Sequence, residues 1–257
     1  MTSRQPEPPP DTAARFSNRA DDYVRHRPSY PAAAIDAILH GLREPSRIHA
    51  VDIGAGTGIS TRLLADRGVH VIAIEPGEAM RAAGESRGRP NIEWRDGTAE
   101  RTGLPDACAD LVLAAQAFHW FRRAEALAEF HRVLKPGGRL ALMWNARDGS
   151  DPLTAGYIQA ILDAGGEHPC EQREFVADTI NDGDFFAPPH VLKMPNEQCL
   201  DLDGLIGRAM SASYTPKDGE RGEFVRNALR ELYERFKGAD GSVALRYETR
   251  VYLADRL

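Results

Sequence analysis

The sequence is poor in cysteine and has neither a long apolar run nor an excess of positive charge. Only three of its 257 residues are cysteines, Cys108, Cys170 and Cys199. No pair of them has CxxC spacing, so neither a disulfide framework nor a zinc site is indicated. No stretch reaches the roughly 18 apolar residues that a transmembrane helix needs, and the first residues lack the apolar core of a secretion signal. These absences favour a cytoplasmic protein with no membrane partner.

Charge and composition indicate an ordinary globular protein that does not bind nucleic acid. Lysine and arginine together number 32 against 38 aspartates and glutamates, which gives a formal net charge of -6. Such a chain lacks the basic surface that grips a phosphate backbone, so no nucleic-acid partner is expected. With 42% hydrophobic and 27% charged residues, the composition is that of an ordinary globular protein. The length fits one large domain or one domain with an appended cap.

The order of apolar segments predicts alternating strands and helices. Residues 1–11 are rich in proline and acidic groups and predict a disordered tail before a single domain at 12–257. The spacing of Ile35, Ile38, Leu39 and Leu42 predicts a helix over 31–42. The expected strands are 47–54, 69–75, 91–96, 109–116 and 139–145, and the helices between them are 58–68, 77–86 and 124–138. This alternation favours an α/β fold with a parallel sheet covered on both faces.

The pattern becomes looser after Asn145. It predicts helices at 154–166, 204–213 and 223–236 and strands at 191–203 and 242–254. We expect residues 148–190 to form part of a cap.

The most informative stretch is VDIGAGTGI, residues 51–59, which joins the first strand to a helix. The alternating glycines Gly54, Gly56 and Gly58 remove side chains, so the backbone can approach a ligand near a helix N-terminus. This pattern predicts a cradle for a nucleotide or cofactor, and a tight turn without a ligand is the alternative. A dinucleotide fingerprint GxGxxG would need glycine at position 59, where this chain has Ile59.

Glu75 ends the second strand about 20 residues after the first glycine of that turn. At this spacing a carboxylate can accept hydrogen bonds from both hydroxyls of a ribose. The alternative is a solvated surface acid. Together with the glycine turn, Glu75 favours a nucleoside-binding site.

The run from Asp52 to Gly58, D-x-G-x-G-x-G, resembles that of class I S-adenosylmethionine-dependent methyltransferases. The LKPGG segment at 134–138 and the run FSNRADDYVRHRPSYP that starts at Phe16 are also similar to the small-molecule branch, which includes trans-aconitate and ubiquinone-type enzymes. The resemblance implies a doubly wound, Rossmann-like, mostly parallel seven-stranded sheet whose last two strands form an antiparallel edge. It implies S-adenosylmethionine as cofactor and methyl transfer to an oxygen, nitrogen or carbon of a small molecule.

The same resemblance implies how the chain is divided and which residues form the site. A helical lid would span 12–44, the cofactor-binding core 45–147, the cap 148–190, and the C-terminal sheet edge and helices 191–257. The implied cofactor-binding residues are Tyr23, Arg27, Asp52, Gly54, Ala55, Gly56, Thr57, Gly58, Glu75, Pro76, Thr98, Ala99, Gln116, Ala117 and Phe118. Thr98 departs from the family, which has aspartate there, so the acidic contact to the adenine amino group is lost.

Catalytic and substrate residues follow from position along the strands. His119, at the carboxyl end of the fourth strand, is the best-placed candidate for a general base. Alternatively, it packs against the cofactor or bonds a backbone carbonyl. The candidate substrate residues are Tyr30, Trp120, Trp144, Arg147, Ser211, Tyr214 and Tyr247. No metal site is indicated.

Other functions stay open at this point. A nicotinamide-dependent oxidoreductase shares the strand, glycine turn and terminal acid, although Ile59 counts against it. A non-catalytic partner protein that binds S-adenosylmethionine is a second alternative. An RNA methyltransferase is disfavoured by the acidic charge.

Overall fold

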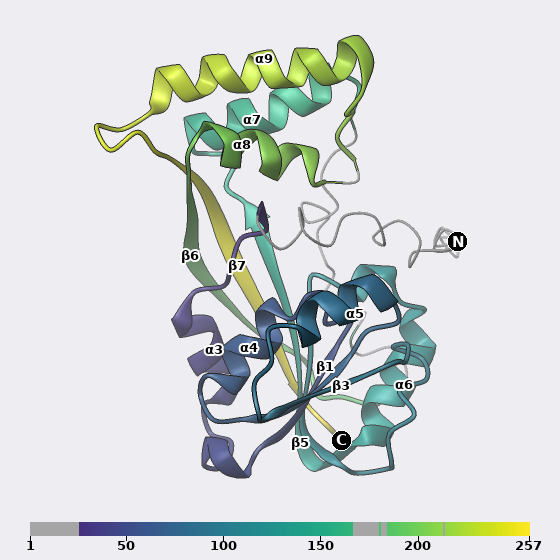
Figure 1. Cartoon of the computed structure of the whole chain (residues 1–257). Coiled ribbons are helices and arrows are strands. Elements are labelled where there is room, and N and C mark those ends of the chain that lie inside the picture. The colour runs from purple at the N-terminus through teal and green to yellow at the C-terminus, as the bar shows by residue number, and fades with distance from the viewer. Residues whose placement is uncertain (1–25, 167–179, 181–183, 213) are drawn as a thin grey trace, which may run out of the picture.

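The computed structural model describes residues 26–166, 180, 184–212 and 214–257 (Figure 1). The expected tail at 1–11 and Tyr23 lie outside this part of the chain. Within it, one seven-stranded sheet has the order β3-β2-β1-β4-β5-β7-β6. The strands are β1 (His49–Ile53), β2 (His70–Ile74), β3 (Ile92–Arg95), β4 (Ala109–Ala115), β5 (Leu134–Arg147), β6 (His190–Leu200) and β7 (Val243–Asp255).

The direction of the strands confirms the expected fold class. β1 pairs in parallel with β2 and β4, β2 with β3, and β4 with β5. β7 runs antiparallel to both β5 and β6, so the last two strands form the antiparallel edge. The carboxyl ends of the parallel strands therefore meet at one edge of the sheet, where such folds bind their ligands.

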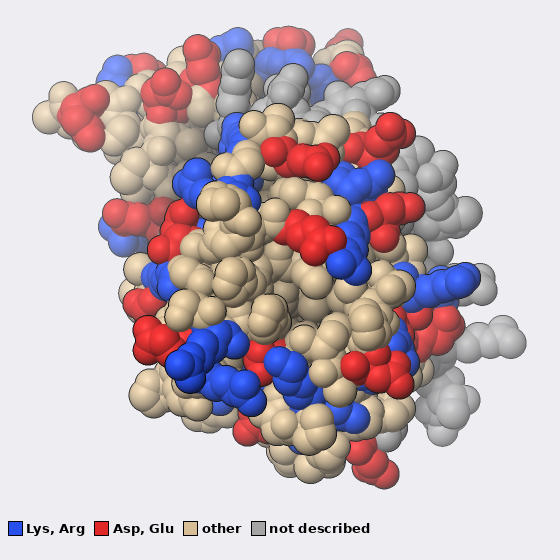
Figure 2. Space-filling view, turned by 60° about the horizontal axis from the view of Figure 1, so that its bottom comes forward, with Lys and Arg blue, Asp and Glu red and all other residues tan. Residues whose placement is uncertain are grey.

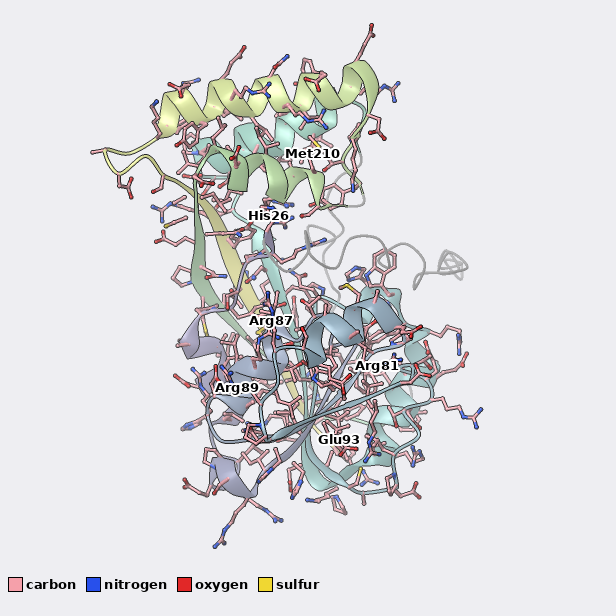
Figure 3. All side chains as sticks on the ribbon, in the orientation of Figure 1. His26, Arg81, Arg87, Arg89, Glu93 and Met210 are labelled. Carbon is pink, nitrogen blue, oxygen red and sulfur yellow. The ribbon has the colours of Figure 1, made fainter. Side chains whose placement is uncertain are left out.

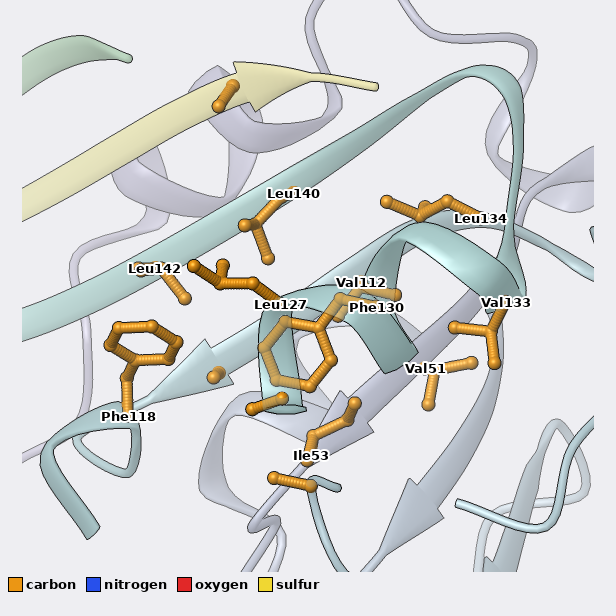
Figure 4. Packing of buried hydrophobic residues seen from close by; sticks show 14 of the residues in the cluster. Val51, Ile53, Val112, Phe118, Leu127, Phe130, Val133, Leu134, Leu140 and Leu142 are labelled. Atoms are coloured by element: carbon orange, nitrogen blue, oxygen red, sulfur yellow. The ribbon is translucent and has the colours of Figure 1, made fainter. Parts of the chain in front are cut away.

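Helices cover both faces of the sheet because successive strand residues point to opposite sides. On one face, α6 (Arg123–Val133) packs Leu127 and Phe130 against Val112 and Leu140 (Figure 4). On the other face lie α3 (Ala32–Leu39) and α4 (Ile59–Ala65), which pack against the alternate residues of the same strands. α5 (Glu78–Glu85) lies beside β3. Short 3-10 helices are η1 (Pro45–Arg47) and η2 (Phe118–Trp120).

Three helices, which we call the cap helices, lie at the far end of the long strands, and two of them fall outside the predicted cap at 148–190. β5, β6 and β7 extend beyond the other strands and carry α7 (Pro152–Asp163), α8 (Leu202–Met210) and α9 (Gly219–Phe236) (Figure 1). These helices bury a separate apolar cluster that includes Ile161, Leu205, Val225 and Leu245. No helix in the described part of the chain is long and apolar enough to cross a membrane. The division of the chain into lid, core and cap stays a prediction.

Several predicted boundaries differ from the structure, including the start of α9, which is Gly219 rather than residue 223. The helix expected over 124–138 ends at Val133, and the LKPGG segment belongs to β5. A register shift between Ala109 and Leu111 on the neighbouring strand absorbs these residues, and Gly137 adopts a φ of 72°. The helix expected from 204 begins two residues earlier, because the Asp201 side chain accepts a hydrogen bond at its N-terminus.

Candidate functional site

A hollow opens at the carboxyl ends of β1 and β4. It encloses about 440 Å³, including space open to solvent, and is lined by Arg27, Pro28, Tyr30, Gly54, Ala55, Gly56, Thr57, Ile59, Ser60, Ala115 and Gln116. Six of the residues expected to bind a cofactor, and Tyr30 expected at the substrate, therefore lie together. The glycine loop and the segment before α3 form opposite parts of its lining.

The glycine loop can take its shape only because side chains are absent. Gly54, Gly56 and Gly58 have φ angles of 66°, 58° and 79°, in the left-handed region that favours glycine. A Cβ on Gly54 would lie 2.8 Å from the Cβ of Ala117, and a Cβ on Gly58 would lie 2.9 Å from the Trp94 ring. The loop thus exposes backbone to the hollow while its other side is packed.

Glu75 clamps this loop from the end of β2. Its Oε2 accepts a hydrogen bond from the Gly56 N–H at 2.8 Å, and its Oε1 accepts one from the Gly77 N–H at 2.8 Å. Desolvation by burial raises the pKa of Glu75 in spite of these bonds. Since a carboxylate has about four acceptor positions, each oxygen can take a further donor, which fits a pair of ribose hydroxyls.

Asp52 supports the loop from beneath. It is fully buried, and its Oδ2 accepts hydrogen bonds from Ser60 Oγ at 2.7 Å and Thr61 Oγ1 at 2.6 Å. Desolvation raises its pKa to about 6. Among the residues that the structure describes, Asp52 Oδ1 and Thr57 Oγ1 have no hydrogen-bond partner although both are buried. A polar ligand in the hollow would satisfy Thr57, so the residues present fit a nucleoside cofactor.

Amide side chains hold the segment before α3, which also lines the hollow. Asn145 Nδ2 donates to the Ser29 carbonyl at 3.0 Å, and Asn196 Nδ2 donates to the same oxygen at 2.8 Å. Thr249 Oγ1 donates to Asn145 Oδ1 at 2.6 Å. Gln116, with a φ of 58°, donates from Nε2 to the Asn145 carbonyl at 3.3 Å. Asn145 therefore connects the end of β5 to both sides of the hollow.

The other expected cofactor residues lie at differing distances from this hollow. Ala117 packs behind Gly54, and Phe118 is fully buried against Phe121 and Phe130 in the core. Pro76 is exposed next to Glu75. Thr98 is exposed and forms a backbone bridge with Arg101, whereas Ala99 is buried in the core. None of these five residues is part of the lining of the hollow.

The expected catalytic and substrate residues fall into three groups. His119 and Trp120 lie in η2, half-buried, with ring centroids 4.9 Å apart. Trp144 packs edge-on against Tyr252 at 5.7 Å on the α6 face, the opposite face from Asn145. The remaining candidates, Arg147, Ser211, Tyr214 and Tyr247, gather beneath the cap.

Sequence reasoning missed three polar residues of this region, Asn145, Tyr157 and Arg208. All three are buried, with exposures of 1%, 0% and 1%. A signal existed for Arg208, because Leu205 and Ala209 place it on the apolar side of α8. An arginine is almost never fully buried unless it is paired.

The chain matches known methyltransferases. A family model described as a methyltransferase domain matches residues 51–142. An uncharacterized methyltransferase of Mycobacterium tuberculosis is 42% identical over 142 residues, which is 54% of this chain and 55% of that protein. An uncharacterized methyltransferase-like protein of Schizosaccharomyces pombe is 30% identical over 249 residues, 94% of this chain and 95% of that one. Thus the alignment spans about half of the mycobacterial relative and nearly all of the yeast relative.

A solved structure agrees with the sequence matches. The structure of a candidate type II methyltransferase from Anaeromyxobacter dehalogenans superposes with a TM-score of 0.63 and 26% identity. The superposition covers 90% of this chain and 96% of that chain.

Proposed function

Because this chain belongs to the class I S-adenosylmethionine-dependent methyltransferases, we propose that it transfers a methyl group from S-adenosylmethionine to a small-molecule acceptor. When bound, this cofactor supplies a sulfonium methyl group, which bonds to the acceptor's lone pair while the electron pair of the carbon–sulfur bond stays on sulfur. The observation that carries the proposal is the glycine loop at 54–58, whose Gly56 N–H binds Glu75. The oxidoreductase and the non-catalytic partner are not favoured by the relatives.

Each part of the hollow has a role in this reaction. The loop backbone would hold the nucleoside together with Glu75, which is not in the lining itself but binds the Gly56 N–H beside it, and Thr57 would satisfy its buried hydroxyl on the same ligand. Arg27 and Tyr30 line the opposite side, where the methionine part of the cofactor would lie. The chain thereby aligns methyl donor and acceptor, and alignment alone supplies much of the rate of such a displacement.

His119 is retained as the candidate base for an acceptor that must lose a proton. It lies in η2, three residues after Gln116, and is not among the residues that line the hollow. Substitution of His119 by glutamine should lower kcat by about 100-fold or more if the imidazole removes that proton, and should leave cofactor affinity unchanged. Equal kcat values for the wild type and the glutamine variant would mean that His119 removes no proton and that the rate comes from alignment of donor and acceptor.

Charge supports a small acceptor. The face in Figure 2 carries acidic and basic side chains interspersed, and the whole chain is acidic. A nucleic-acid substrate would call for a basic stripe. The cytoplasmic location inferred from the sparse cysteines remains a prediction.

Calorimetry with S-adenosylhomocysteine tests the cofactor site. The wild-type protein should bind it, and Glu75→Gln should bind about tenfold more weakly because a charge-assisted acceptor becomes a neutral one. Glu85→Gln, an exposed position at the end of α5, is the matched control and should not change the affinity. Absence of binding by the wild type at millimolar ligand would remove the proposal, and formation of S-adenosylhomocysteine with cell extract would exclude a purely binding role.

A further inference from the structure

Residues 26–30, which precede α3, are bound by side chains from β6 at the antiparallel edge of the sheet. Gln198 donates from Nε2 to the His26 carbonyl at 3.0 Å. Asn196, two residues earlier on the same strand, donates from Nδ2 to the Ser29 carbonyl at 2.8 Å. Residues two apart on a strand lie on the same face of the sheet, so the segment crosses that face of β6.

Asn145 on β5 binds the same Ser29 carbonyl from a second strand. Its Nδ2 donates to this oxygen at 3.0 Å. Its Oδ1 accepts hydrogen bonds from Thr249 Oγ1 at 2.6 Å and from Asn196 Nδ2 at 3.1 Å. These two donors determine the orientation of the Asn145 amide and aim its Nδ2 at the carbonyl. Three strands therefore contribute to holding this one backbone group.

Packing contacts fix the two ends of the segment. The His26 ring lies against α8, where a Cβ on Gly207 would come within 2.5 Å of it (Figure 3). At the other end, Tyr30 is 9% exposed and belongs to the apolar cluster that α3 and α4 form with the sheet. Arg27, Pro28 and Tyr30 line the hollow. The lining residues thus lie on a segment that is fixed on both sides.

The shape of this segment depends on the side chains that bind it. Residues 27–31 belong to no helix or strand, so no backbone ladder determines their conformation. We call Asn145, Asn196 and Gln198 the edge amides. They bind the segment through its carbonyl groups and are not among the residues that line the hollow. Any effect of the edge amides on a ligand must therefore pass through residues 26–30.

We propose that the edge amides are positioning residues, which hold Arg27, Pro28 and Tyr30 at the hollow and thereby set the affinity for the amino-acid part of the cofactor. The inference rests on the proposed function, because it takes the hollow as the cofactor site and this segment as the neighbour of the methionine part. The glycine loop and Glu75 act on the nucleoside instead. The two parts of the cofactor are thus held by different regions of the chain.

Two ligands separate these regions. S-adenosylhomocysteine carries the nucleoside and the amino-acid part, whereas methylthioadenosine keeps the nucleoside and the sulfur and lacks the amino-acid part. Calorimetry should show that the wild type binds S-adenosylhomocysteine more tightly than methylthioadenosine. Equal affinities would overturn the inference, because the amino-acid part would then gain nothing from the segment.

Variants of the edge amides remove the donors and keep the fold. Asn196→Asp and Gln198→Glu keep the shape of the side chain and lose the hydrogen that binds the carbonyl. Each should weaken S-adenosylhomocysteine by about fivefold to tenfold and leave the affinity for methylthioadenosine unchanged. Asn196→Ala adds no charge and should give the same selective loss. Glu75→Gln should weaken both ligands, because it acts on the part that they share.

Asn91→Asp is the matched control. Asn91 Nδ2 also donates to two backbone carbonyls, those of Ala65 at 2.8 Å and Val69 at 2.9 Å, which lie outside the lining of the hollow. This variant should lower the melting temperature and leave both affinities unchanged. An equal loss of both ligands in Asn196→Asp and Gln198→Glu would mean that the edge amides only support the fold, and unaltered affinities would equally contradict the positioning role.

The wild type distinguishes the two levels of the argument. If it binds S-adenosylhomocysteine but the variants of the edge amides show no selective loss, only the positioning role fails. If it does not bind S-adenosylhomocysteine at millimolar ligand, the proposed function itself fails.

Discussion

Asp52 makes the folded protein sensitive to pH in an unusual direction. Burial at the end of β1 is the largest influence on this carboxyl and raises its pKa from 3.8 to about 6, against the hydrogen bonds from Thr61 and Ser60. The folded state therefore keeps this proton at pH values where the unfolded chain has lost it, and stability falls as pH rises from about 4 to 6. A shift of about two pKa units corresponds to about 3 kcal/mol of unfolding free energy.

Asp52→Asn removes the titration while its side-chain oxygen can still accept the two hydroxyl hydrogen bonds. Urea unfolding of the ligand-free wild type and variant at pH 4, 5, 6, 7 and 8 gives the difference in free energy of unfolding. We expect this difference, variant minus wild type, to rise by about 3 kcal/mol between pH 4 and pH 7. Glu85→Gln reports the general effect of removing one exposed negative charge.

A difference that is independent of pH would refute the reasoning, because it would mean that Asp52 titrates alike in both states. A decrease with pH would reverse the assigned cause, since it would require hydrogen bonding to outweigh desolvation. The unfolding free energy of the wild type must be subtracted from that of the variant at each pH, because other carboxyl groups titrate in the same range.

Three further substitutions test other parts of the structure. Burial alone would raise the pKa of Glu129, but hydrogen bonds from Arg132 and Thr102 hold this pKa at about 2. The stability that this carboxylate contributes is therefore lost as pH falls from 4.5 toward 2. Glu129→Gln should flatten the acid side of the profile of unfolding free energy against pH, measured by circular dichroism. Gly84→Ala places a Cβ 2.2 Å from the β3 indole and should lower the free energy of unfolding by about 1 to 3 kcal/mol in thermal melts; an unchanged melt would contradict this packing. Asn145→Asp replaces the donor to the Ser29 carbonyl by an acceptor, so S-adenosylhomocysteine should bind more weakly to the variant than to the wild type. Calorimetry of both proteins at pH 8 checks this, and equal affinities would contradict the role of this hydrogen bond.

Local signals made the glycine loop and its contact with Glu75 predictable. The glycine loop and the acid that ends β2 belong to adjacent elements, and their spacing follows from one strand, one helix and one further strand. The parallel core could be predicted for the same reason, since each strand is a short apolar run bounded by turns. The β5 boundary was missed because the LKPGG glycines and proline are accommodated by a register shift in the sheet, which local pattern does not encode.

The buried polar group beneath the cap could not be predicted in this way. Arg147 meets Tyr247 only through the antiparallel ladder, a hundred residues along the chain. Tyr157 and Arg208 each lie among mainly apolar residues on the buried side of a helix. Which face receives such a residue depends on the docking of three cap helices, and that is a tertiary property.

The part of the chain that matches the family model contains the glycine loop but not the buried polar group. The family model matches residues 51–142, a range that contains the glycine loop and Glu75 and ends before Asn145 and Arg147. The matched part therefore contains the loop and the acid that we propose to hold the cofactor, whereas the buried polar group lies in the antiparallel edge and the cap helices. Asn145 joins the two, because it binds the segment before α3 and lies two residues from Arg147 on one strand.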